Sequence, residues 1–154
     1  MPHPDALTRF LPDLRRFAAA LTGSPRSRAD ELVLRALRDV MVKAPEAGDG
    51  AGDDQLKRGL RANLAHLAHV QVPRHPAANA NAFETALLDL PSTHRAALIL
   101  ICVEDCTYEE AAQTLGVNRA VLIGRLAAAR QLMARRLQEE ARSDEAPPYL
   151  RLVK

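Results

Sequence analysis

The chain has 154 residues, of which 47% are apolar and 26% charged, and its formal net charge is +2. This composition suffices for one domain or two small domains with buried cores, and it excludes an intrinsically disordered chain. Aromatic residues make up only 3% and Trp is absent, which favours helices packed through aliphatic stripes over β-sheets. A net charge this small does not by itself indicate a nucleic-acid partner, so such a prediction must rest on where the charges lie.

Three helices are expected in the amino-terminal part of the chain. Apolar residues recur at helical spacing over residues 5–22, and Gly23 follows as a stop. A second helix is predicted to begin with a cap at Ser27 and to end before Pro45, because proline cannot continue a helix. Residues 45–54 are rich in Gly and Asp and indicate a loop before the third helix. The apolar stripe of that helix consists of Leu56, Leu60, Leu64 and Leu67.

The stretch PRHPAANANA at residues 73–82 divides the chain. It contains two prolines and no large apolar side chain, which is typical of an interdomain linker. Since the elements on either side are helical, we expect an all-α fold of two small helical domains, residues 5–72 and 83–142, joined by this linker. Residues 143–154 are expected to form a tail that is either disordered or a short docking segment.

Two helices are expected after the linker, at about residues 83–89 and from 92 to about 103. Cys102 and Cys106 lie near the end of the second one and lack the Cys-x-x-Cys spacing of a zinc site, so we interpret them as buried structural thiols. No metal and no other cofactor are expected.

Residues 107–137 have the pattern of a helix-turn-helix. Thr107 and Glu110 form a T-x-x-E capping box, which fixes the start of a helix that is expected to end near Gly116. Asn118 is expected to cap the long final helix. The inward stripe of this final helix consists of Leu122, Leu126, Ala129 and Met133.

Several functional classes are not indicated by any motif. The sequence has no Gly-rich phosphate loop, Ser-centred elbow, paired catalytic carboxylates or His/Glu metal motif, so we predict that the protein is not an enzyme. No run of apolar residues reaches the roughly 18 that a membrane span requires, and no secretion signal is recognisable at the start. We therefore expect a cytoplasmic protein without a membrane span.

Residues 87–133 read LLDLPSTHRAALILICVEDCTYEEAAQTLGVNRAVLIGRLAAARQLM. This stretch resembles domain four of extracytoplasmic-function (ECF) sigma factors, which read the promoter's upstream element. Its LP..HR pair, its VED.TYEEAA..LGV run and its RL..AR group fall in the order and spacing of that family. The stretch FLPDLRRFAAALTGSPRSRADELV, residues 10–33, resembles the start of domain two in sigma factors of the bacterial general stress response. It is equally similar to the sigma-mimicking domain of their PhyR-type response regulators.

The chain departs from the ECF pattern in places where that family contacts its partners. After DELV, the family carries Gln and an acid that help it dock on the polymerase clamp helices, whereas this chain has Leu34 and Arg35. No aromatic residue lies between Phe17 and Phe83, although promoter opening in the family uses aromatic stacking on extruded bases. In the final helix, positions where the family often shows Thr, Ser and a further Arg are occupied by Val121, Gly124 and Ala128.

The resemblance implies two sets of contact residues. The segment from residue 111 to residue 138 contains no acid, so its polar and basic groups can attract phosphate but offer little to distinguish bases. The predicted DNA-binding residues are Asn118, Arg119, Arg125 and Arg130. The residues predicted to contact RNA polymerase or an anti-sigma factor are Asp30, Glu31, Leu34, Arg35, Lys57, Arg58 and Arg61.

Two functions are compatible with the sequence. The preferred one is an ECF sigma-factor-like protein that binds core RNA polymerase and promoter DNA in transcription initiation, because the match to domain four is the strongest. The alternative is a degenerate sigma mimic that antagonises an anti-sigma factor. It would use exposed apolar patches on the second and third helices and on the helix beginning at Tyr108.

Overall fold

The structure is a computed structural model that describes residues 4–23, 26–43, 52–71 and 79–145. Within these residues the chain forms seven α-helices and no β-strand, which confirms the predicted all-α fold. No helix in this part of the chain is long and apolar enough to cross a membrane.

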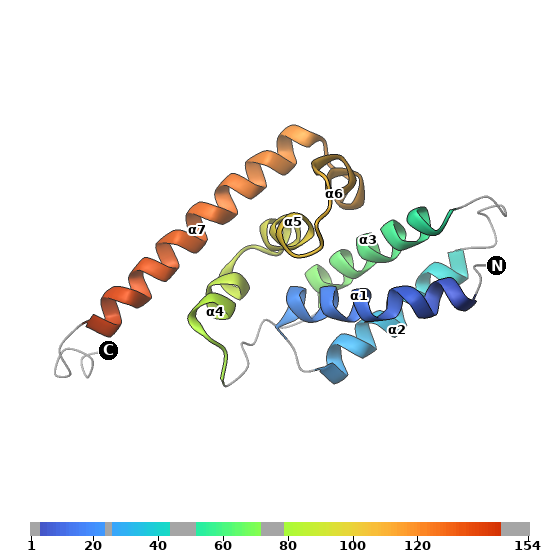
Figure 1. Ribbon diagram of the computed structural model, residues 1–154, viewed down its shortest axis with the longest axis horizontal. Helices are drawn as coiled ribbons and strands as arrows, with labels where there is room; N and C mark the ends of the chain where they lie inside the picture. The colour runs from blue at the N-terminus through green and yellow to red at the C-terminus, as the bar shows by residue number, and fades with distance from the viewer. Residues whose placement is uncertain (1–3, 24–25, 44–51, 72–78, 146–154) are drawn as a thin grey trace.

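The helices α1 (Pro4–Thr22), α2 (Arg26–Lys43) and α3 (Asp53–Gln71) form the amino-terminal half (Figure 1). Each of the three packs against the other two. The apolar stripes predicted for the first and third helices face the core, and they are buried apart from Leu7, Leu11 and Leu56, which are partly buried. Helical periodicity therefore identified the inner faces of this half correctly.

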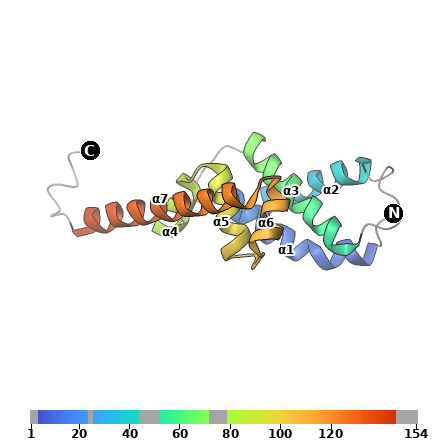
Figure 2. The same ribbon diagram turned by 90° about the horizontal axis from the view of Figure 1, so that it is seen from above.

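The carboxy-terminal half consists of α4 (Ala82–Asp89), α5 (Ser92–Cys102), α6 (Tyr108–Leu115) and α7 (Arg119–Glu145). The long helix α7 packs against the other three. Its end projects away from the amino-terminal half (Figures 1 and 2). The stripe predicted for this helix faces inward, since Leu122, Leu126, Ala129 and Met133 are all buried.

The helix-turn-helix of α6 and α7 is fixed by the predicted caps. The Thr107 side chain accepts from the backbone N–H of Glu110, and the Glu110 carboxylate accepts from the backbone N–H of Thr107 at 2.8 Å. Gly116 ends α6 with φ of 63°, a left-handed conformation that favours glycine. Asn118 Oδ1 accepts from the backbone N–H of Val121 at 2.8 Å, as expected for the cap of α7.

The boundaries of some elements differ from those expected. Because α2 already begins at Arg26, Ser27 lies inside the helix and the prediction that it caps this helix was wrong. Glu145 ends α7, so the helix enters the expected tail of residues 143–154; residues 146–154 lie outside the described part. Of the expected linker, residues 73–78 are likewise outside it, Asn81 caps α4 and Ala82 is the first residue of that helix.

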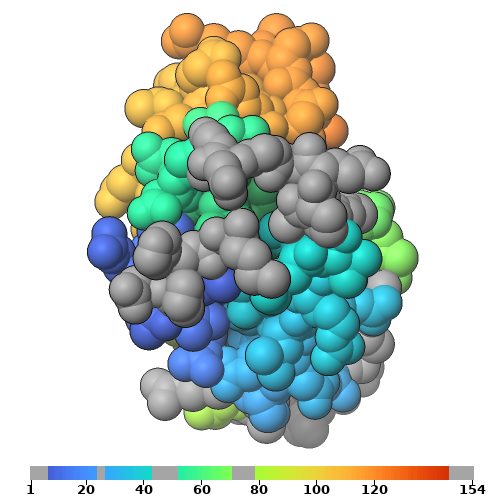
Figure 3. All heavy atoms as spheres, turned by 90° about the vertical axis from the view of Figure 1, so that its right-hand side faces the viewer, coloured from blue at the N-terminus to red at the C-terminus, as the bar shows by residue number. Residues whose placement is uncertain are grey.

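The two halves pack against each other. Both α5 and α6 contact α3, and α5 also contacts α1. Phe17, Leu60, Leu100 and Leu122, which come from both halves, belong to one continuous hydrophobic cluster. In the view onto the amino-terminal half, α6 lies directly beside α3 (Figure 3). The division into two domains at residues 73–82 stays a prediction, and in this arrangement both halves bury apolar surface together.

Arg95, the arginine of the LP..HR pair, joins the ends of two helices inside the fold. Only 3% of its surface is exposed. Its Nε donates to the carbonyl of Leu87 at 3.1 Å, and its Nη2 donates to the carbonyls of Leu88 and Leu90 at 2.9 and 2.8 Å. Its Nη1 donates to the carbonyl of Leu21 near the end of α1. The guanidinium thus donates to carbonyls in the last turns of α1 and α4, where helical backbone donors run out.

The end of α1 lies close to α4 at Gly23. This residue has φ of 59°, and a Cβ atom at this position would overlap the side chain of Leu88. Glycine is therefore required here both for the backbone conformation and for the approach of α4.

Replacement of Arg95 by leucine should destabilise the whole chain. The substitution leaves buried carbonyl oxygens without donors, which costs about 3 kcal/mol or more of unfolding free energy. Urea denaturation followed by circular dichroism measures this change. Arg135→Leu, at an exposed position of α7, is the control and should change the unfolding free energy by about 0.5 kcal/mol or less. Equal effects of the two substitutions would contradict the role assigned to Arg95.

Candidate functional site

The predicted DNA-binding residues are spread over the cap and about the first three turns of α7. Asn118, Arg119 and Arg130 are exposed, and Arg125 is partly buried. The guanidinium carbon of Arg119 lies 5.8 Å from the ring centre of Tyr108, a cation–π distance. The Asn118 side-chain oxygen is engaged in capping, so only its amide nitrogen remains to meet a partner.

The side of α7 opposite its buried stripe carries mostly small and apolar residues. This α7 outer face consists of Ala120, Ile123, Gly124, Ala127 and Gln131. All of them are exposed, and Ile123 is 47% exposed. Val121 and Leu132, on the flank, are 42% and 38% exposed. Apart from Gln131, the outer face carries no side-chain hydrogen-bonding group with which to read a base edge.

A second exposed surface lies along α2. Glu31, Leu34, Arg35, Arg38 and Asp39 line a shallow groove there. Leu34 is 61% exposed, and it is followed along the helix by the exposed Met41 and Val42. Asp30, at the start of the same helix, forms an exposed ion pair with Arg15, with a distance of 2.8 Å between Arg15 Nε and Asp30 Oδ1. Four of the predicted contact residues are thus gathered on α2.

The other three, Lys57, Arg58 and Arg61, are directed toward the carboxy-terminal half. They line a hollow of about 230 Å³ together with acidic groups that include Glu104 and Glu110. These cations therefore have anionic neighbours within the chain. All three are partly buried, and their predicted role in binding an external partner stays a prediction.

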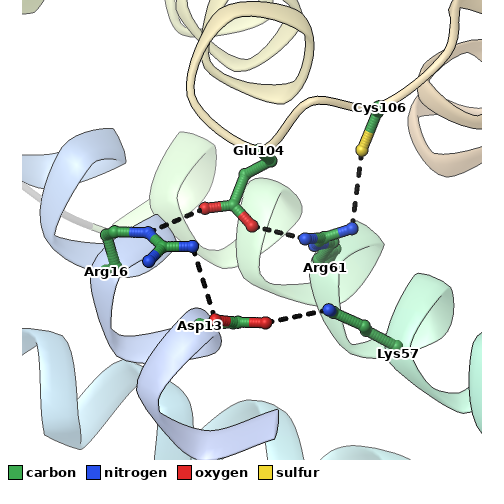
Figure 4. Close-up of polar contacts among 6 residues, drawn as sticks. All are labelled: Asp13, Arg16, Lys57, Arg61, Glu104 and Cys106. Carbon is green, nitrogen blue, oxygen red and sulfur yellow. Dashed lines mark hydrogen bonds and ion pairs between the residues drawn. The ribbon is translucent and has the colours of Figure 1, made fainter.

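Charged side chains form a network between the halves (Figure 4). Lys57 Nζ lies 2.9 Å from Asp13 Oδ2, and Arg16 Nη2 lies 3.3 Å from Asp13 Oδ1. Glu104 forms ion pairs with Arg16 and Arg61. The hydrogen bond from Lys57 is the main cause that lowers the pKa of Asp13, against the opposing effect of burial. We call Asp13, Arg16, Lys57, Arg61 and Glu104 the interhalf network.

The two cysteines lie at the edge of this region. Cys102 is exposed, so its interpretation as a buried thiol was wrong, because α5 ends there and the side chain faces solvent. Cys106 is partly buried and accepts a hydrogen bond from Arg61 Nη1 at 3.4 Å. Burial raises the pKa of the Cys106 thiol, which favours its protonated form. Among the described residues, no group of three or more His, Cys, Asp or Glu side chains is placed to hold a metal ion.

Sequence reasoning did not identify the acidic members of the interhalf network, Asp13 and Glu104. The spacing of Asp13 and Arg16, and of Lys57 and Arg61, places each pair on one helix face and was available as a signal. Nothing local connects Glu104 to them, since it lies in the turn after α5, in the other half of the chain.

Comparisons with known proteins agree with this architecture. Residues 80–133 match the family model of sigma-70, region 4. The structure is similar to that of the sigma factor RpoE in its complex with the anti-sigma factor NepR from Bartonella quintana. The TM-score is 0.66 and the identity 27%, over 87% of this chain and 95% of the other. None of the curated proteins compared with the chain matches its sequence.

Two further structures have the same fold. The anti-anti-sigma factor PhyR, complexed with NepR from Bartonella quintana, gives a TM-score of 0.61 and 26% identity over 81% of this chain and 47% of PhyR. The PhyRSL–NepR complex from Sphingomonas sp. Fr1 gives 0.65 and 24% identity over 89% of this chain and 90% of the other, a likeness of fold alone. The expected resemblance to ECF sigma factors and to PhyR sigma-like domains is confirmed.

The capping box of α6 should make stability depend on pH. Hydrogen bonds from the Thr107 backbone and hydroxyl lower the pKa of Glu110 from its ordinary value of 4.5. A lowered pKa in the folded state stabilises the fold above the unfolded pKa, and this contribution is lost as the pH falls through the folded value. Glu110→Gln keeps an accepting oxygen but does not titrate.

We therefore expect the melting temperature of the wild type to exceed that of Glu110→Gln near neutral pH. The difference should shrink as the pH is lowered below about 4.5. Thermal unfolding of both proteins followed by circular dichroism across this range measures it. A constant difference at all pH values would contradict the electrostatic role of Glu110.

Proposed function

We propose that this chain, a helical sigma-like protein with a sigma-70 region 4 segment at residues 80–133, acts in transcription regulation by binding an anti-sigma factor. Two structural neighbours above 25% identity are a sigma factor and an anti-anti-sigma factor, and both were solved bound to NepR. Binding an anti-sigma factor is thus the property that these two kinds of protein have in common.

The exposed apolar face of α7 is the observation that carries the proposal. A helix that reads bases needs donors and acceptors on its outer side, whereas Ile123 and the small residues around it offer apolar contact. Gly124 and the neighbouring alanines allow the backbone of a partner helix to approach closely. Ile123 can then be buried against the apolar side of that partner, as in helix-in-groove recognition.

The charges around this face indicate what the partner must carry. From residue 119 to residue 138, α7 has five arginines and no acid. Arg136 forms an ion pair with Asp89, while Arg119 and Arg130 lie exposed beside the outer face. A partner helix with an apolar stripe bordered by Asp or Glu would match this surface in both shape and charge.

The surface on α2 offers a second contact for the same partner. Leu34, Met41 and Val42 are exposed there, next to Arg35. After DELV, Leu34 and Arg35 stand where the ECF pattern has Gln and an acid. The acid that would repel an acidic partner is therefore absent. Contact with both halves would extend the interface beyond the area that one short helix face provides.

Replacement of Ile123 by glutamate should weaken binding to NepR. The substitution places a charge in the middle of the apolar face, so we expect at least about a ten-fold increase in the dissociation constant. Isothermal titration calorimetry with purified NepR from Bartonella quintana measures it.

Phe83→Glu is the matched control for this experiment. Phe83 is also a large apolar residue, 55% exposed, but it lies on α4, away from the proposed surface. Its replacement should leave the dissociation constant within about two-fold. The proposal fails if the wild type does not bind NepR, or if the two substitutions weaken binding equally.

Sigma-factor activity is the second candidate function. It is favoured by the acid-free beginning of α7, where Arg119, Arg125 and Arg130 can attract phosphate groups. An active sigma factor and a sigma mimic would both bind an anti-sigma factor, so binding alone does not separate them. What separates them is engagement of core RNA polymerase and of a promoter.

Run-off transcription separates these two candidates. On the basis of the apolar outer face of α7, we expect the chain to bind NepR but to yield no transcript when it is added to core RNA polymerase with promoter-containing genomic fragments. The measurement includes co-purification of the chain with core polymerase and uses RpoE of Bartonella quintana as a positive control. A discrete transcript that depends on the chain would identify it as an active sigma factor.

A further inference from the structure

Glu104 lies in the turn between α5 and α6, where it projects between α1 and α3 (Figure 4). Its side chain has no exposed surface. Arg16 Nε of α1 lies 3.4 Å from Glu104 Oε1, and Arg61 of α3 forms an ion pair with Oε2. One carboxylate of the carboxy-terminal half is thus held between two helices of the amino-terminal half.

The burial of Glu104 depends on the contact between the halves. A carboxylate removed from water needs charged or hydrogen-bonding partners, and both cationic partners of this one come from the amino-terminal half. If the halves separate, water solvates Glu104 and both arginines. If one arginine is removed while the halves stay together, the buried carboxylate keeps a single cationic partner, so the closed arrangement is weakened relative to separation.

The remaining members of the interhalf network hold these partners in place. Asp13 lies between Arg16 and Lys57, and it connects α1 with α3 across the surface that receives Glu104. Only 13% of the Arg61 side chain is exposed, and the side chain also donates to Cys106 in the same turn. Ion pairs within the amino-terminal half thus border the surface that receives Glu104.

In the same closed arrangement, α3 and the flank of α7 line a common groove. Arg125 lines a groove together with Ala62, Ala65 and His66 of α3 and with Ser92 of α5. The volume of this groove is about 220 Å³. A recognition helix must enter a major groove about 12 Å wide, and a duplex has no room along this flank of α7 while α3 lies there.

We propose that Glu104 is a latch that holds the two halves closed, and that the closed arrangement shields Arg125 from duplex DNA. All residues of the latch lie within one chain, so its closure requires no bound partner. Release of Glu104 moves α3 away from α7 and makes the arginine available to phosphate. Opening of the latch, rather than a change within α7, then controls contact with DNA.

Glu104→Lys in the full chain tests the latch. It places a third cation beside Arg16 and Arg61, so the radius of gyration from small-angle X-ray scattering should increase while the helical circular dichroism is retained. Affinity for a mixed-sequence duplex, measured by fluorescence anisotropy, should rise about ten-fold, equivalent to ~1.4 kcal/mol. Adding Arg125→Ala to this variant should abolish the gain.

Two controls separate opening from charge and from misfolding. Glu109→Lys makes the same charge change at an exposed position of α6, and it should alter neither the radius of gyration nor the DNA affinity by more than about two-fold. Arg16→Ala removes a cation and one partner of Glu104, so a gain in DNA affinity in this variant cannot come from added charge. It provides the test if Glu104→Lys does not fold.

Equal scattering and equal DNA affinity for the Glu104 and Glu109 variants would overturn the latch. Opening without a gain in affinity, or a gain that persists after Arg125→Ala, would overturn the shielding of Arg125. Neither measurement involves an anti-sigma factor, so the outcome is independent of the proposed function.

Discussion

A single buried guanidinium, that of Arg95, determines how the helices of the two halves can be arranged. It donates hydrogen bonds to the carbonyl of Leu21 at the end of α1 and to the carbonyls of Leu87, Leu88 and Leu90 at the end of α4 and its cap. Since Arg95 lies on α5, these bonds fix three helices relative to one another. The helix-turn-helix packs on α5, so its position also follows from this one side chain.

The features that could be predicted from the sequence are local ones. Capping depends on residues three positions apart, which is why Thr107, Glu110 and Asn118 indicated the ends of α6 and α7 correctly. The buried stripe of α7 repeats every three or four residues and followed from the same kind of pattern. The composition of the outer face, with Ile123 and Gly124 where polar groups would be expected, was also readable from the sequence.

The contacts between the halves could not be predicted in this way. Arg95 meets Leu21 across 74 positions and Glu104 meets Arg16 across 88, and no periodicity connects residues so far apart. The sequence gives no sign that Lys57 and Arg61 have acidic neighbours within the chain, because Asp13 and Glu104 come from other elements. The exposure of Cys102 was missed for a related reason, since it depends on where α5 ends against its neighbours.

The distribution of charge along α7 adds to the dipole of the helix instead of opposing it. Five arginines and no acid occupy residues 119–138, whereas Glu139, Glu140, Asp144 and Glu145 follow at the other end, with Arg142 as the only cation among them. Backbone dipoles make the start of a helix positive and its end negative, so this order of charges is unfavourable for the stability of α7 itself. It gives the helix a strong electrical polarity over a length of about 40 Å. A negatively charged molecule approaching from solution is therefore oriented toward the start of α7, near the junction of the two halves, before any side chain touches it.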